Sequence, residues 1–195
     1  KTAAPVLLAY GELLESWSLV NALRTLLFKG SFMTESHIIP CGVIERSFYE
    51  TLSSDLAKTY SLTSRRGAFR EASKHIKTAV ETNCLGPLFG ILNGPLDKCS
   101  KGIPLLPSDD REVSRKLLYL HGDPGNILIL YDCVRRQVEP EDASSWLLKK
   151  TSSLPKDVLD RSILSRNFAE LTRLLASAES GRYLSNMPSN GPTDE

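Results

Sequence analysis

The sequence carries almost no net charge, because 24 Lys plus Arg balance 23 Asp plus Glu and leave a formal charge of +1. Such a chain has no overall field that would attract nucleic acid or an anionic membrane unless basic residues cluster locally. It also has no apolar run close to the roughly 18 residues that a membrane-spanning helix needs. These absences exclude a membrane-embedded protein and weaken any general nucleic-acid-binding interpretation.

Patterns for metal binding are missing as well. The three histidines have no HxH or HExxH spacing, and the four cysteines include no CxxC pair. The cysteines lie mostly among apolar residues, as buried thiols of reducing compartments do. We therefore expect no metal, no cofactor and reduced thiols. The first residue is Lys1 rather than Met, so we expect part of a longer protein. The cysteine pattern favours an intracellular protein of the cytoplasm or nucleus, with a mitochondrial location left open.

Apolar residues make up 41% of the 195 residues, an ordinary share for a packed core, and they recur mainly at helical spacing. One stripe predicts a helix over 5–14. A second predicts a helix capped by Ser18 and ended by Gly30, so that the two form a hairpin. Further stripes predict helices over 43–56 and 69–83.

Glycine and proline concentrate between Gly86 and Pro107. This density of helix breakers predicts a packed connector with only a short helix at 88–92. After the connector we predict a helix capped by Asp109 or Asp110, which ends at a turn over 121–125.

The segment 126–136 is ambiguous, because its Ile and Leu run also fits a buried strand. Its helical neighbours favour a helix. Shorter helices follow, opened by Pro140, opened by Pro155 or spanning 168–178. The patterns together predict an all-α fold of about eight or nine helices, arranged as antiparallel helical hairpins in an irregular solenoid-like or helical-bundle architecture.

The predicted organisation has four parts. Residues 1–85 form N-terminal helical hairpins, and 86–107 form the Gly/Pro-rich packed connector. Residues 108–184 form C-terminal helical hairpins, and the small, polar residues of 185–195 form a flexible tail.

A local signature begins in the second half of the chain. Ile127, Tyr131 and Val134 follow one another at four- and three-residue steps, and a polar turn leads to Pro140. This pattern resembles a unit of the tetratricopeptide and pentatricopeptide repeat families, whose units recur at about 34 residues. The resemblance implies a degenerate helical-repeat domain with an outer face for a partner. The alternative is an irregular helical domain whose stripes serve packing alone.

Either arrangement predicts a non-catalytic helical interaction module that binds a protein or peptide partner within a larger assembly. Trp17 and Trp146 are its candidate contact residues. The pentatricopeptide resemblance implies an alternative, a single-stranded RNA-binding module with basic doublets as phosphate contacts. The doublets are Arg65 with Arg66, Arg135 with Arg136, and Lys149 with Lys150.

The segment from His121 to Asn126 resembles the catalytic loop of aminoglycoside-phosphotransferase-like kinases. The resemblance implies Asp123 as the base and Asn126 as a metal ligand. These two residues lie two positions closer together than in the family pattern, and no glycine-rich phosphate loop or strand lysine precedes them. A phosphotransferase-like enzyme is therefore the remote alternative, and we interpret 121–125 as a tight turn between helices that Asp123 caps.

Overall fold

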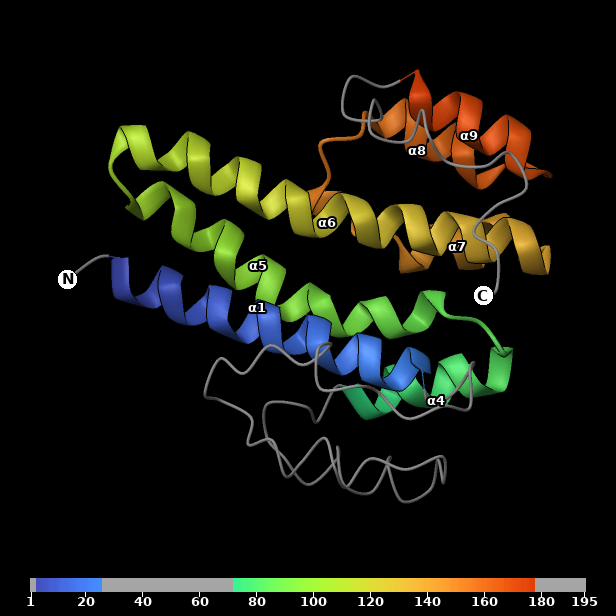
Figure 1. Cartoon of the computed structure of the whole chain (residues 1–195), viewed down its shortest axis with the longest axis horizontal. Helices are drawn as coiled ribbons and strands as arrows, with labels where there is room; N and C mark the ends of the chain where they lie inside the picture. Colours follow the sequence, from blue (N-terminus) through green and yellow to red (C-terminus); the bar gives the residue numbers. More distant parts are fainter. Residues whose placement is uncertain (1–2, 26–71, 178–195) are drawn as a thin grey trace. The chain divides into compact units, whose positions relative to one another are not determined.

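The computed structural model describes residues 3–25 and 72–177. Over these ranges the chain forms α-helices and short 3-10 helices and contains no strand (Figure 1). The predicted all-α class is thus confirmed. The chain divides into two compact units between Arg115 and Lys116, and each is described separately below.

Several predictions concern residues outside the described ranges. They are the helix over 43–56, the basic doublet Arg65 with Arg66, and the tail over 185–195.

The first unit begins with a single helix, α1 (Ala3–Arg24). The predicted hairpin within this stretch is wrong. Ser18 does not cap a new helix, because its hydroxyl donates to the Leu14 carbonyl oxygen one turn earlier at 3.1 Å. A serine that bonds back to its own helix leaves the backbone ladder uninterrupted, so the two predicted helices are one.

The prediction of only a short helix at 88–92 is also wrong, because residues 86–105 are helical throughout. After α4 (Ala72–Thr82), the chain runs through consecutive helical segments. These are η4 (Gly86–Leu92), α5 (Asn93–Gly102) and η5 (Ile103–Leu105). Pro87 and Pro104 each fall within the first two positions of a 3-10 segment, where a missing backbone N–H costs little.

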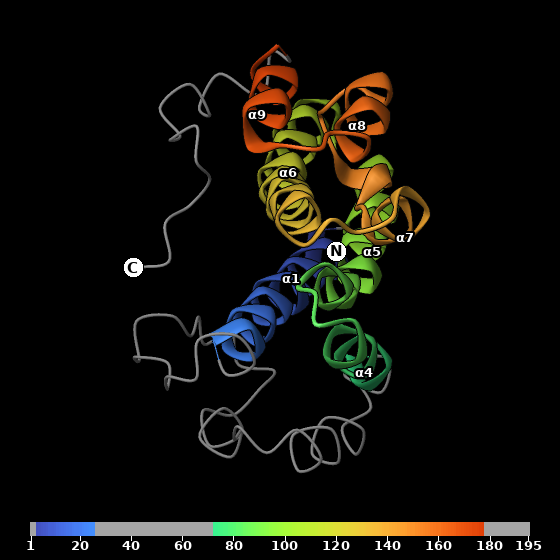
Figure 2. The same ribbon diagram turned by 90° about the vertical axis from the view of Figure 1, so that its right-hand side faces the viewer.

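The core of the first unit lies where α1 runs beside η4 and α5 (Figures 1 and 2). Its leucines are fully buried, and each contributes about 1.5–3 kcal/mol through the area it removes from water. They are Leu13, Leu19, Leu23, Leu88, Leu92 and Leu96. Two glycines permit the close helix contacts, because a Cβ at Gly90 would overlap the His75 ring and one at Gly102 would meet Val6 Cγ2 at 2.8 Å.

The longest described helix is α6 (Ser108–Arg136), with 29 residues. Asp109 and Asp110 lie inside its first turn, so neither is the predicted cap, although both complement the positive end of the helix dipole. The Tyr10 hydroxyl of α1 donates to the Ser114 carbonyl oxygen at 2.7 Å. Burial and the neighbouring Cys99 raise the pKa of Tyr10 to about 12, so the phenol stays protonated and can donate at neutral pH.

The second unit places three short helices after α6. They are α7 (Pro140–Trp146), α8 (Lys156–Ile163) and α9 (Phe168–Ala176), with the 3-10 turn η6 (Lys149–Thr151) between α7 and α8. The predicted starts at Pro140, Pro155 and Phe168 are therefore confirmed to within one residue.

Tyr131 joins α6 to α9. Its ring stacks on Phe168, with centroids 5.5 Å apart and planes 18° from parallel, and its hydroxyl lies 2.7 Å from the Thr172 hydroxyl. Ile127 and Val134, which lie four residues before and three residues after Tyr131, are also buried. These residues therefore serve packing, as the helical spacing predicts, and the repeat interpretation itself stays a prediction.

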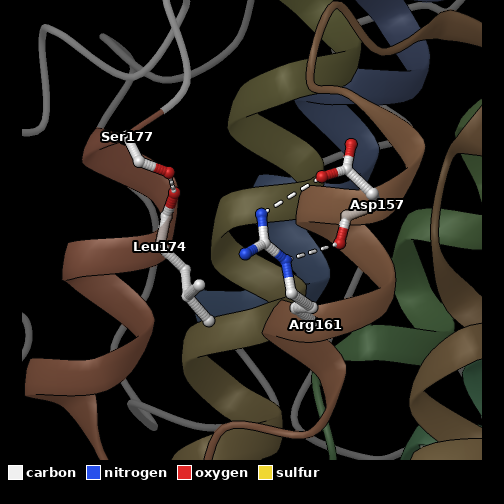
Figure 3. A network of polar contacts seen from close by, with 4 residues as sticks. All are labelled: Asp157, Arg161, Leu174 and Ser177. Atoms are coloured by element: carbon white, nitrogen blue, oxygen red, sulfur yellow. Dashed lines mark hydrogen bonds and ion pairs between the residues drawn. The ribbon is translucent and has the colours of Figure 1, made fainter.

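The surface of the α8–α9 pair carries local polar contacts (Figure 3). Arg161 bonds the Asp157 carboxylate at 3.1 Å and the Asp157 carbonyl oxygen at 3.2 Å, one turn earlier in α8. The Ser177 hydroxyl donates to the Leu174 carbonyl oxygen at 2.6 Å at the end of α9. The exposed ion pair of Arg161 with Asp157 contributes only about 0.3–0.5 kcal/mol to stability.

The side chains of Cys84, Cys99 and Cys133 are buried. Among the helices that the structure describes, none has the length and apolarity needed to cross a membrane.

Candidate functional site

The segment predicted to be a turn lies inside α6. This prediction is wrong even though the local sequence opposes a helix: Pro124 removes one backbone bond, at about 3 kcal/mol, and Gly122 and Gly125 each cost about 1 kcal/mol relative to Ala. Contacts from elsewhere in the chain must therefore hold the helix together at this point. They come from residues 147–153, which connect α7 to α8 and which we call the strap.

Asp123 makes the strongest contacts with the strap. Its Oδ1 accepts from the Ser152 hydroxyl at 2.6 Å and from the Ser153 backbone N–H at 2.9 Å. Its Oδ2 accepts from the Ser153 hydroxyl at 2.5 Å. Only 3% of Asp123 is exposed, so these donors replace the water that a buried carboxylate would otherwise need.

Asn126 holds the same strap one turn further along α6. Its Oδ1 accepts from the Leu148 backbone N–H at 2.7 Å, and its Nδ2 approaches the Leu148 carbonyl oxygen at 3.5 Å. Gly122 lets the strap come close, because a Cβ there would overlap the Thr151 carbonyl oxygen. The side chains of Asp123 and Asn126, with the open face of Gly122, therefore form a clamp on an irregular piece of backbone.

This clamp bears on the phosphotransferase resemblance. Both oxygens of Asp123 are occupied by donors from the strap, and the Asn126 amide spans a backbone N–H and C=O. Burial lowers the pKa of the half-buried His121 below its ordinary value. In the described residues no three His, Cys, Asp or Glu side chains gather where they would hold a metal ion. The geometry is that of a structural contact between two parts of the second unit.

The two tryptophans lie in different units. Trp17 is half-buried, and its ring meets Phe89 edge-to-face with centroids 5.8 Å apart. Its indole N–H is buried without a hydrogen-bond acceptor among the described residues. Trp146 is half-buried at the end of α7. Both side chains are partly accessible to solvent.

The residues of the two described basic doublets differ in their exposure and in the contacts that their charged groups already make. The Arg136 guanidinium bonds the buried Asp132 carboxylate at 2.8 Å, one turn earlier in α6, so this charge is already balanced. Arg135 and Lys150 are exposed. Lys149 is exposed too, and its ammonium group donates to the Ser144 hydroxyl at 2.6 Å.

An apolar stripe on the surface of α6 is the feature that sequence reasoning missed. Val113, Leu117 and Leu120 are 59%, 44% and 64% exposed. At about 100° per residue they fall within about 60° of one another around the helix. Leu118 lies on a different face and is only 2% exposed. The i, i+4, i+7 spacing was visible in the sequence, but it does not say which of two apolar faces the fold covers.

Comparison with known proteins adds no identification: no family model, no curated protein and no solved structure matches this chain.

Proposed function

We propose that the chain is a non-catalytic helical interaction module that binds a protein or peptide partner through the apolar stripe of α6. The observation that carries the proposal is the exposure of Val113, Leu117 and Leu120 on one helical face. Large contiguous apolar patches on the surface of a soluble protein often mark a contact surface. Transfer of such side chains from water to an apolar contact is favourable, at about 25 cal/mol per Å².

The spacing of the stripe also suggests the chemistry of the partner. Anchors at i, i+4 and i+7 match the apolar face of an amphipathic helix, which packs by interleaving side chains of the same spacing. Exposed charges of both signs, Glu112 and Lys116, lie beside the stripe around α6. A partner helix with an apolar face and mixed charged flanks therefore fits this surface best.

The test compares two variants that each raise the net charge by two. Leu117→Lys with Leu120→Lys removes the stripe, and Glu112→Lys alters an exposed residue of the same helix while keeping both leucines. Each protein is used as bait in cell extract, and captured proteins are quantified by mass spectrometry. We expect a set of partners that is retained by the wild type and by Glu112→Lys and is reduced at least about 10-fold by the leucine pair.

A capture pattern unaffected by the leucine pair would refute this function. Salt-dependent binding of single-stranded RNA that is lost on changing Arg135, Lys149 and Lys150 to Glu would instead support the RNA-binding alternative. Turnover of a nucleotide by the chain, abolished by Asp123→Asn, would show an enzyme.

A further inference from the structure

The clamp on the strap depends on a hydroxyl group that is open to chemical modification. Ser152 is half-exposed and lies between η6 and α8, with its backbone extended at φ −109° and ψ 138°. Its hydroxyl donates to the buried carboxylate of Asp123 at 2.6 Å and accepts from the Leu154 N–H at 3.1 Å. Lys149 and Lys150, both exposed, stand three and two residues before it.

We propose that Ser152 is a phosphorylation site for a basophilic protein kinase, and that its phosphorylation releases the strap from α6. Kinases of this class select serines by cationic side chains just upstream, which meet acidic residues of the kinase. An extended, irregular segment is also the backbone form that fits a substrate groove. Ser145, an exposed serine of α7, lacks this context, because Asp142, Ala143 and Ser144 precede it.

The reaction is an ordinary phosphoryl transfer from ATP. The Ser152 Oγ attacks the γ-phosphorus and forms an O–P bond, while the bond from the γ-phosphorus to the β,γ-bridging oxygen breaks and ADP leaves. The hydroxyl proton passes to the catalytic base of the kinase. Phosphorylation therefore needs the Ser152 hydroxyl to leave Asp123 for a time, through a local opening of the strap.

The product cannot remake the native contact. A phosphoserine has no proton on its Oγ to donate. Its phosphate group carries a charge of about −1.5 to −2 at pH 7, and this charge would lie next to the Asp123 carboxylate. Asp123 is nearly fully buried, so water screens this repulsion little. The Ser153 and Leu148 bonds to α6 belong to the same strap and would open with it.

The site is tested with the whole chain, Mg²⁺–ATP and the catalytic subunit of cAMP-dependent protein kinase. Wild type, Ser152→Ala and the control Ser145→Ala are compared by phosphopeptide mapping, after circular dichroism has shown that each is folded. We expect phosphate on Ser152 in the wild type and in Ser145→Ala, and its loss in Ser152→Ala. Phosphate only on other residues, or none, overturns the assignment.

The release of the strap is tested by amide hydrogen exchange on the phosphorylated chain. We expect the amides of Leu148 and Ser153 to exchange at least about 10-fold faster, with α1 unchanged. In the Asp123→Asn background the increase caused by phosphate should be smaller, because the repelling carboxylate is gone. Phosphorylated Ser152 with unchanged exchange at these amides overturns the release, and an equal increase in the Asp123→Asn background overturns the repulsion as its cause.

Discussion

Replacing Asp123 with alanine is the most direct perturbation of the clamp between α6 and the strap. The substitution removes three charge-assisted hydrogen bonds, from the Ser152 hydroxyl, the Ser153 N–H and the Ser153 hydroxyl. It also removes the contacts that offset the helix-breaking effect of Pro124 in the next position. We therefore expect the second unit to be destabilised selectively.

The expected loss in the free energy of unfolding depends on the groups that lose their hydrogen bond to Asp123. Hydrogen bonds to a charged group contribute about 1.5–3 kcal/mol each, and contributions of contacting groups do not simply add. Ser152 and Ser153 are half-exposed, so water can partly replace the carboxylate. We expect Asp123→Ala to lower the free energy of unfolding of the second unit by about 3 kcal/mol. Asp123→Asn should cost less, about 1–2 kcal/mol, because its Oδ1 still accepts.

Tryptophan fluorescence can report the second unit separately. The chain has two tryptophans, Trp17 in the first unit and Trp146 in the second. In a Trp17→Phe background, urea unfolding followed by fluorescence therefore reports the surroundings of Trp146. Separate reporting matters because two compact units need not unfold in one step.

Asp160→Ala is the matched control, since Asp160 is an exposed carboxylate of α8 and its loss should change stability by less than about 0.5 kcal/mol. An Asp123→Ala midpoint indistinguishable from that of Asp160→Ala would show that the clamp does not stabilise the unit, and the reasoning about Pro124 would fail with it.

Three further outcomes follow from particular contacts. Gly122→Ala should destabilise the second unit by about 2–3 kcal/mol in the same urea assay, because its Cβ would overlap the Thr151 carbonyl oxygen. Gly94→Ala lies in the first unit and has nothing within 4 Å of its Cβ, so it should be neutral or stabilising by up to about 1 kcal/mol when Trp17 is the reporter in a Trp146→Phe background. Burial raises the pKa of the Cys99 thiol to about 11, so at pH 8 the thiolate fraction of Cys99 is about 100-fold smaller than that of a thiol with pKa 9.0. Iodoacetamide should therefore label Cys99 only at higher pH or on unfolding. Rapid labelling of Cys99 in the native chain at pH 8 would contradict this. Arg161→Ala should lower stability by no more than about 0.5 kcal/mol by urea unfolding, because its ion pair is exposed.

The helical class of the chain was predictable because it depends on local spacing. Apolar residues at three- and four-residue steps identified the described part of the helix over 69–83 and the start at Phe168. Prolines located the starts of α7 and α8, because Pro140 is the first residue of α7 and Pro155 is the N-cap of α8. The burial of Ile127, Tyr131 and Val134 followed from the same periodicity.

Several predictions failed because they treated glycine and proline as boundaries. Between Gly86 and Pro107 the prolines fall at the starts of successive short segments, so the chain stays helical. The turn predicted over 121–125 failed for a related reason. Its residues look like a loop, but both oxygens of Asp123 bind a strap whose serines lie 29 and 30 positions later.

The order of residues alone determined that this chain forms amphipathic helices, because backbone hydrogen bonds and apolar periodicity act within a few turns. The tertiary structure decided that α6 continues through Pro124, since the strap supplies donors that satisfy a buried carboxylate there. It also decided that Leu118 is covered while Leu117 and Leu120 face water, because burial depends on which segments meet in space and not on spacing along one helix.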